Sequence, residues 1–194
     1  MTNPKSRLRT EMMARRDALP PEERARIAEA LTAELTRLPQ YAAARAVLAT
    51  MSIGSEWSTR GFLERARADG KTVVLPRLTE PPRRLALHAV DDLDRHLVPG
   101  VWSIPEPDPV RCPVFERDEV DFAVVPALAV DRAGYRLGYG AGYFDRLLAG
   151  RGGRPFCVTA LPAAFVVESL PHEAHDVAVD LVLDERGARA GARP

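Results

Sequence analysis

The chain has 194 residues, of which 46% are hydrophobic and 28% are charged, a composition that suits one domain with a substantial core. Its 27 basic residues balance 27 acidic ones, so no overall charge favours nucleic acid or an anionic membrane surface. No apolar run approaches the roughly 20 residues of a membrane helix. We therefore expect neither nucleic acid nor a membrane as partner, and we also expect a monomer.

The two cysteines, Cys112 and Cys157, show no metal-binding or redox spacing, and the N-terminus is polar and basic rather than apolar. These features predict a cytoplasmic protein with reduced thiols. The tail at 186–194 is rich in Gly, Ala and Arg, and we expect it to be disordered. The expected domain therefore spans residues 1–185.

Residues 4–19 predict an amphipathic helix, because apolar side chains recur near one stripe. Lys5 and Arg9 are four residues apart, so both side chains project from the same face. This spacing fits either a solvated basic face or a pair of cations that reaches a phosphate. A second helix is predicted after Pro20, and its buried stripe comprises Ile27, Leu31, Leu35 and Leu38.

The next segment predicts a β-α-β crossover unit. Residues 46–51 predict a buried strand, a helix is expected from Ser58 as N-cap to Gly70 as C-terminal stop, and residues 71–76 predict the next strand. A strand, helix and strand in this order imply a parallel sheet. Further strands are predicted at 85–90, 156–161 and 177–183.

In open parallel sheets, ligands bind beyond the carboxyl ends of the strands, which is where Met51 and Glu56 fall. A lone loop glutamate is nonetheless more often solvated than functional. Trp102 lies in a non-helical segment with two prolines, at 101–107. It fits either the wall of a pocket for a ring system or a cap on the core.

The stretch at 120–151 combines a predicted strand at 120–129, a loop containing Gly138, Gly140 and Gly142, and a helical spacing at 143–148. A glycine loop that leads into a helix can bind an anion, because backbone N–H groups approach the ligand closely. The glycine spacing does not fit a dinucleotide fingerprint, and no Lys-Ser or Lys-Thr pair follows as a Walker A loop requires.

Two interpretations of this stretch remain. In one, the loop holds phosphates, with Arg136 as a cation and Asp145 as a carboxylate for a metal. In the other, it is a flexible helix entry, and Tyr143 and Phe144 belong to the core. Glycine content alone does not decide between them.

The segment at 170–176 resembles a zinc motif only superficially. His172 and His175 are three residues apart after a proline, whereas the HExxH motif needs histidines four apart on a helix. Asp176 is the more informative residue, because it precedes a predicted strand and could bring a second carboxylate to a magnesium ion.

Five segments then form one pattern: KSRLR at 5–9, GSEWST at 54–59, WSIPEP at 102–107, VVPALAVDRAGYRLGYGAGYFDR at 124–146 and LPHEAHD at 170–176. In this order the segments resemble the 5-formyltetrahydrofolate cyclo-ligase family, also called methenyltetrahydrofolate synthetase. The resemblance extends from Lys5 to about Glu185, and the glycine segment is its most specific part.

This resemblance implies an enzyme that uses ATP and Mg²⁺. ATP phosphorylates the formyl oxygen of 5-formyltetrahydrofolate, a second folate nitrogen attacks the iminium phosphate, and loss of phosphate gives 5,10-methenyltetrahydrofolate and ADP. The implied fold is a single three-layer α/β/α domain with a mainly parallel sheet, similar to sugar-phosphate isomerases and CoA transferases.

The resemblance also implies roles for individual residues. Arg136 and Tyr143 would be catalytic, and Asp145 and Asp176 would hold Mg²⁺. The implied ATP-binding residues are Lys5, Arg9, Arg136, Leu137, Gly138, Tyr139, Gly140, Ala141, Gly142, Tyr143 and Phe144. The implied folate-binding residues are Met51, Glu56, Trp102, Tyr139, Gly140, Ala141, Gly142 and Tyr143.

The chain departs from the family pattern at a few positions. Phe144 replaces the second residue of a double tyrosine, and Phe165 stands where a glutamine is often found. Two other functions are compatible with the sequence. One is an isomerase or transferase on the same scaffold, which would leave Lys5, Arg9 and Asp145 without a joint role. The other is a non-catalytic protein that binds folate or a nucleotide.

Overall fold

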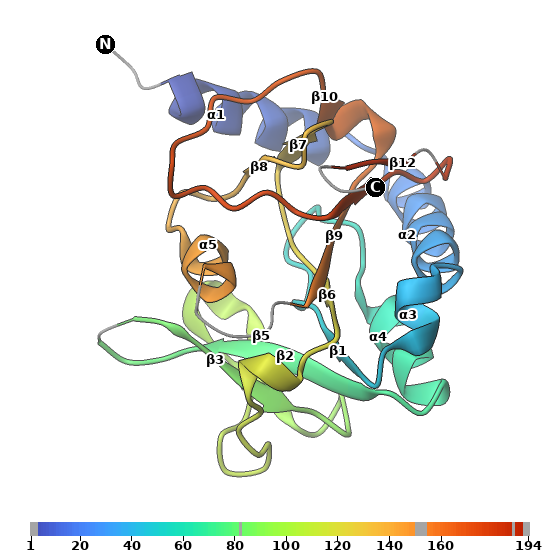
Figure 1. The fold of residues 1–194 in the computed structure, drawn as a ribbon, viewed down its shortest axis with the longest axis vertical. Coiled ribbons are helices and arrows are strands. Elements are labelled where there is room, and N and C mark those ends of the chain that lie inside the picture. Colours follow the sequence, from blue (N-terminus) through green and yellow to red (C-terminus); the bar gives the residue numbers. More distant parts are fainter. Residues whose placement is uncertain (1–3, 82, 150–154, 188, 192–194) are drawn as a thin grey trace.

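The computed structural model describes residues 4–81, 83–149, 155–187 and 189–191, and its fold is mixed α/β. A seven-stranded sheet in the order β12-β11-β9-β6-β1-β2-β3 forms its centre (Figure 1). The strands are β1 (Ala46–Leu48), β2 (Thr72–Leu78), β3 (Leu85–Ala89), β6 (Phe122–Val124), β9 (Phe156–Ala160), β11 (Leu181–Leu183) and β12 (Arg189–Ala190). The five inner strands are parallel, and both edge strands are antiparallel to their neighbours. The predicted mainly parallel sheet is therefore confirmed.

The strand order reverses at the middle of this sheet. From β1 the chain passes to β2 and then to the edge strand β3, after which it returns across β1 to β6, β9 and β11. The connections that leave β1 and β6 therefore run in opposite directions. In open parallel sheets such a reversal opens a crevice at the carboxyl ends of the two strands.

The helices are α1 (Pro4–Asp17), α2 (Pro21–Thr36), α3 (Pro39–Ala43), α4 (Arg60–Ala68) and α5 (Tyr143–Leu148). The predicted stripe of α2 is confirmed for Ile27, Leu31 and Leu35, which are at most 7% exposed. Leu38 is also buried, but it lies beyond the end of α2, at the N-cap of α3. Gly70 ends α4 with φ +75°, as predicted. The N-cap is Thr59 rather than Ser58, and its hydroxyl does not cap the helix. It donates instead to the carbonyl of Thr50 at 2.6 Å and accepts from the Ser52 amide at 3.1 Å, which fixes the loop after β1.

Alternate residues of the inner strands face two separate hydrophobic clusters. Val47 and Val73 pack with α2, α3 and α4 around Phe62 and Phe122, both of which are fully buried. Leu48 belongs to the second cluster, which also contains Met12 of α1 and Leu148 of α5. The sheet is thus covered on both faces, as a mainly parallel sheet requires.

The predicted strand at 120–129 is wrong as one element. β6 ends at Val124, and Ala129–Asp131 forms β7 in a second sheet with β8 (Arg136–Leu137) and β10 (Val166–Val167). Pro126 lies between β6 and β7 and has no N–H to donate to a strand ladder, so the chain leaves the main sheet here. The change of sheet directs residues 129–137 towards α1 (Figure 1).

The predicted strand at 177–183 is also too long, because only Leu181–Leu183 pairs in the sheet. Val177 is excluded because its amide donates to Asp145 and its carbonyl accepts from Arg136. Arg189–Ala190 pairs with β11, whereas residues 188 and 192–194 of the expected disordered tail lie outside the described residues.

The remaining elements are short. A hairpin of β4 (Leu97–Pro99) and β5 (Pro105–Pro107) holds the 3-10 turn Val101–Ser103, and two further 3-10 turns span Arg117–Glu119 and Ala163–Phe165. Strands β3 and β9 confirm the predictions at 85–90 and 156–161. Within the described part of the chain, no helix combines the length and apolar character needed to cross a membrane.

Candidate active site

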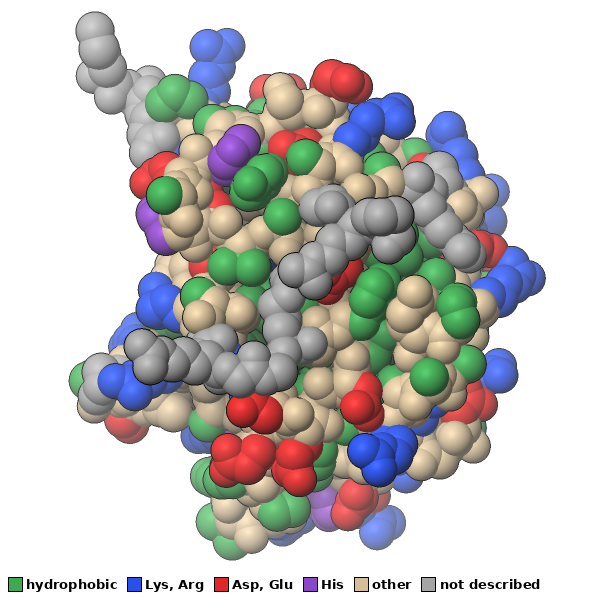
Figure 2. Space-filling model, in the orientation of Figure 1, with side chains coloured by type: hydrophobic (Ala, Val, Ile, Leu, Met, Phe, Trp, Pro, Cys, Tyr) green, Lys and Arg blue, Asp and Glu red, His purple; other side chains and the backbone are tan. Residues whose placement is uncertain are grey.

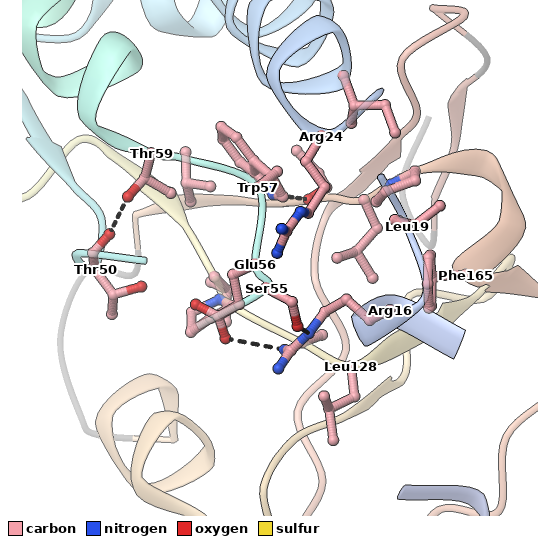
Figure 3. A pocket seen from close by; sticks show the side chains of 18 residues that line it. Arg16, Leu19, Arg24, Thr50, Ser55, Glu56, Trp57, Thr59, Leu128 and Phe165 are labelled. Atoms are coloured by element: carbon pink, nitrogen blue, oxygen red, sulfur yellow. Dashed lines mark hydrogen bonds and ion pairs between the residues drawn. The ribbon is translucent and has the colours of Figure 1, made fainter. Parts of the chain in front are cut away.

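A pocket lies at the reversal point of the sheet (Figure 3). It is lined by the carboxyl-end segments of β1, β6 and β9 and closed by α1, α2 and the Leu19 segment between them. Its apolar lining is Leu19, Ile27, Trp57, Val124, Val125, Pro126, Ala127, Leu128, Ala160, Leu161, Pro162 and Phe165, and its polar lining is Arg16, Arg24, Thr50, Ser55, Glu56 and Thr59. A mostly apolar pocket with a few convergent polar groups is typical of a small-molecule site.

Trp57 fixes one wall of this pocket. Its indole is 8% exposed, and its Nε1 donates to the carbonyl of Ala160 at 2.9 Å. The hydrogen bond joins the loop after β1 to the end of β9. Because the ring nitrogen is satisfied within the protein, Trp57 offers a ligand only its apolar surface.

Glu56 supplies the negative charge at the pocket. Its Oε2 accepts from the Ile53 amide at 3.0 Å, and its Oε1 accepts from the hydroxyl of Tyr139 and pairs with Arg16 Nη1 at 3.5 Å. Figure 3 shows the side chains of Arg16 and Glu56 pointing toward one another, joined by this contact. These three donors hold the carboxylate in one orientation at the edge of the pocket.

Tyr139 joins this pocket to the glycine loop. Burial, followed by the charge of Glu56 and the hydrogen bond to it, raises the pKa of the Tyr139 hydroxyl to about 12. The phenol therefore keeps its proton at neutral pH and remains a donor to Glu56. Tyr139, which directly precedes Gly140, is thus anchored to the loop that follows β1.

The glycine loop lies against α1. Arg9 Nε donates to the Gly138 carbonyl at 2.8 Å. Gly140 has φ +103°, and a Cβ there would lie 3.2 Å from Cζ of Arg9. Gly142 has φ +63° and immediately precedes α5. Glycine at 140 and 142 thus permits the backbone turn and leaves room for the guanidinium of Arg9.

A second, more open pocket adjoins this loop. Gly140, Ala141, Gly142, Asp145, Arg146, Ala149 and His175 line it. The guanidinium of Arg146 lies 5.0 Å from the ring of Tyr143, and His175 is 71% exposed. The pocket therefore has glycine backbone on one side and groups of both charges on the other.

Asp145 is held by a buried cation. Arg136 Nη2 donates to Asp145 Oδ1 at 2.8 Å, and the Arg136 side chain is only 4% exposed. Burial lowers the pKa of Arg136, against the opposing effect of Asp145. Since its Nη1 donates to the Val177 carbonyl, Arg136 orients Asp145 and the segment at 177 rather than facing solvent.

Asp176 is paired with α1. Lys5 Nζ donates to Asp176 Oδ2 at 2.8 Å and to Glu173 Oε1 at 3.3 Å. Burial alone would raise the pKa of Asp176, but hydrogen bonds from Lys5 and the Glu173 amide lower it overall. Burial would likewise lower the pKa of Lys5, and the two carboxylates raise it. The pair is therefore charged on both sides at neutral pH.

The two carboxylates fit a magnesium ion that is completed by other ligands. Asp145 accepts from the amide of Val177, which directly follows Asp176, at 3.2 Å, so both acids belong to one neighbourhood. Among the described residues, no three His, Cys, Asp or Glu side chains gather as a metal site. Mg²⁺ commonly uses one or two carboxylates together with waters and substrate phosphates, which matches this donor set.

The structure brings together most but not all of the predicted residues. Glu56 lines the pocket, whereas Met51 does not and packs instead against the cluster that contains α2 and α4. Trp102 is 67% exposed on the β4–β5 hairpin and is also absent from the pocket lining. Leu137 is buried and Phe144 is partly buried in the second cluster.

Arg16 was missed by the sequence interpretation. It donates to Ser55 Oγ at 2.8 Å and to Tyr139 Oη at 2.7 Å and therefore lies at the centre of the site. The helical spacing of Arg16 in the sequence could have identified it. Arg16 follows Lys5 by eleven residues, close to three helical turns, so it shares the face of α1 that carries Lys5 and Arg9.

Comparison with known proteins agrees with this geometry. A model of the 5-formyltetrahydrofolate cyclo-ligase family matches residues 1–185. The chain is 34% identical over 181 residues to the 5-formyltetrahydrofolate cyclo-ligase of Mycolicibacterium smegmatis, with 92% of each chain covered. It is 27% identical over 186 residues to the enzyme of that name from Mus musculus, with the same coverage of both chains.

Two solved structures share the fold. The 5,10-methenyltetrahydrofolate synthetase of Aquifex aeolicus superposes with a TM-score of 0.83 at 30% identity, covering 98% of this chain and 93% of that one. A synthetase of the same name from Mycoplasma pneumoniae gives a TM-score of 0.74 at 19% identity, covering 94% and 99%, and this match shows the fold alone. The family model, the curated relatives and the shared fold confirm the predicted family, and the chain belongs to the 5-formyltetrahydrofolate cyclo-ligase family.

Proposed function

We propose that the protein catalyses the ATP- and Mg²⁺-dependent cyclisation of 5-formyltetrahydrofolate to 5,10-methenyltetrahydrofolate, releasing ADP and phosphate. One observation carries this proposal. An apolar pocket with a carboxylate and a glycine loop with cations adjoin one another and are joined through the hydrogen bonds of Tyr139. A reaction between a flat heterocycle and a nucleotide needs two such subsites side by side.

The folate subsite is the pocket at the reversal point. In the proposal, Trp57 and Phe165 provide flat apolar walls, and Glu56 accepts hydrogen bonds from the polar edge of the pterin. Met51 and Trp102 remain proposed folate contacts, but neither lines this pocket. Phe165 lines this pocket and is 2% exposed. Where relatives often have a glutamine, this chain therefore has an apolar side chain at the end of the pocket.

The ATP subsite is the glycine loop and the face of α1 that packs on it. The formyl oxygen is a poor nucleophile, so catalysis depends on aligning it with the γ-phosphate and on neutralising charge. Arg9 and Lys5 supply cations from α1, and the glycines at 138, 140 and 142 let the backbone approach phosphate closely. Tyr143 begins α5 beside this loop and would flank the reacting group.

Magnesium, when bound, would neutralise the charge of the phosphates during transfer. Asp145 and Asp176 are the residues proposed to hold it. Arg136 is proposed to act through Asp145, because its buried guanidinium fixes one oxygen of that carboxylate. Asp145 would then present its other oxygen without first having to reorganise.

The proposal extends to the assembly of the protein. The two clusters on opposite faces of the sheet support a single three-layer α/β/α domain over residues 1–185, related to the sugar-phosphate isomerase and CoA-transferase folds. We also propose a cytoplasmic monomer. Figure 2 shows positive and negative side chains interspersed over one face, which offers no single-sign surface for a polyanion.

The test is a direct assay. Purified protein with ATP, Mg²⁺ and 5-formyltetrahydrofolate should form a product that absorbs in the near ultraviolet, together with ADP. Absence of that absorbance with every divalent metal tried would contradict the proposal. Folate binding without ADP release would favour a non-catalytic binding protein, and product formation without ATP would favour an isomerase or transferase.

A further inference from the structure

The guanidinium of Arg16 connects three segments that are far apart in the sequence. It lies on α1 and is 13% exposed. Its Nε donates to Ser55 Oγ at 2.8 Å, and its Nη1 donates to Tyr139 Oη at 2.7 Å and pairs with Glu56 Oε1 at 3.5 Å. Tyr139 also donates to Glu56, so Arg16, Tyr139 and Glu56 form a closed triangle.

The hydrogen bonds of this cluster restrict the orientations of its side chains. Ser55 has one hydroxyl proton, which it donates to Asp17, so its oxygen is oriented to accept from Arg16. Glu56 is in turn restrained at its other oxygen by the Ile53 amide. Loss of Arg16 would therefore release both a carboxylate and a phenol from their present orientation.

The same helix holds two consecutive residues of the glycine segment. Arg9 binds the carbonyl of Gly138, and Arg16 binds the side chain of Tyr139. Gly140 follows directly and has φ +103°, which few other residues adopt. Because Gly138 and Tyr139 lie immediately before this turn, the two arginines fix where the turn begins relative to the pocket.

We propose that Arg16 is a positioning residue that aligns the folate subsite with the glycine loop. It orients Glu56 towards the substrate and fastens the loop through Tyr139. This inference rests on the proposed function, in which Glu56 contacts the pterin and the loop contacts ATP. Arg16 acts through these two residues rather than on the reacting atoms.

Three variants and a control test the inference by steady-state kinetics. Arg16→Met should raise the KM for the folate about tenfold, lower kcat by a smaller factor and change the KM for ATP less than about threefold, because it removes the charged partner of Glu56. Arg16→Lys should recover only part of the loss, because one ammonium cannot reproduce the planar fork. Tyr139→Phe should show a smaller change of the same kind. Arg7→Met removes the same charge from an exposed position of α1 and should match wild type.

A double-mutant cycle on the urea unfolding equilibrium gives a readout independent of activity. Arg16→Met combined with Tyr139→Phe should deviate from additivity by about fivefold in the unfolding constant, within the range for contacting residues. Additive effects would overturn the inference, and so would a folate KM for Arg16→Met or Arg16→Lys equal to that of Arg7→Met. If wild type itself forms no product, the proposed function fails, yet the unfolding cycle still decides whether Arg16 positions Tyr139.

Discussion

Replacing Asp145 should separate its proposed catalytic role from its structural one. Its carboxylate pairs at 2.8 Å with Arg136, whose side chain is 4% exposed, and also accepts from the Val177 amide. Asp145→Ala therefore leaves a buried guanidinium without its carboxylate. It also removes one of the two proposed ligands of the magnesium ion.

The two consequences differ in size. Loss of one partner of a buried ion pair typically costs about 3–5 kcal/mol, and we expect about 3 kcal/mol because Asp145 is itself 23% exposed. Turnover should fall about 10²- to 10³-fold, the usual effect of losing one preorganised electrostatic contact. The double variant with Arg136→Met removes the unpaired cation as well. It should regain about 1–2 kcal/mol of stability while its turnover stays low.

Urea unfolding and the near-ultraviolet product assay measure these effects separately. Glu168→Ala is a matched control, because Glu168 forms an ion pair with Arg132 at 3.5 Å in which both side chains are well exposed. It should change stability by less than about 1 kcal/mol and leave turnover intact. Full activity of Asp145→Ala would contradict the magnesium assignment. A double variant as unstable as the sum of the two single variants would contradict the structural role of the pair.

Three further predictions concern the two subsites. Glu56→Gln should raise the KM for the folate about tenfold, since it removes the charge that pairs with Arg16 and that is proposed to face the pterin. An unchanged KM would place the pterin elsewhere. Gly140→Ala should lower kcat/KM for ATP, because φ +103° disfavours alanine and the new Cβ would lie 3.2 Å from Arg9 Cζ. Initial rates over a range of ATP concentrations measure this value. A wild-type kcat/KM would show that the loop has another conformation. The stability lost in Asp176→Asn should be constant between about pH 5 and 9. This loss should shrink in acid, as Asp176 is protonated, because its pKa is below its ordinary 3.8. It should also shrink in base, as Lys5 is deprotonated, because its pKa is above 10.5. Urea unfolding of both proteins across this pH range measures the loss.

Local periodicity predicted the elements that are long and regular. The stripe of α2 and the glycine stop at Gly70 both depend on neighbouring residues, and the structure confirms them. The split between β6 and β7 was missed, although Pro126 marks it, because a buried apolar run has the same composition whether it crosses one sheet or two. Val177 was misassigned for a different reason. Its backbone groups are used by Asp145 and Arg136, and such long-range partners cannot be inferred from periodicity.

Candidate residues were identified from motifs, whereas their contacts were not. The motifs named Lys5, Arg136 and Asp145 as ligands of phosphate or metal. They did not indicate that Lys5 is paired with Asp176 or that Arg136 is buried against Asp145. Arg16 was missed because it belongs to none of the matching segments, although its helical phase is that of Lys5.

The position of α1 explains how this glycine loop could bind phosphate. α5 has six residues, so its N-terminus contributes less of a helix dipole than a long helix would. Positive charge beside the loop comes instead from side chains: Arg146 of α5, and Arg9 of α1, which is separated from the loop by more than a hundred residues of sequence. Because Lys5 binds Asp176 and Arg16 binds Tyr139 and Glu56, the same helix also contacts the carboxylate segment and the proposed folate pocket. The site is therefore assembled around α1, and changes that displace this helix should impair both subsites together even where the central sheet is intact.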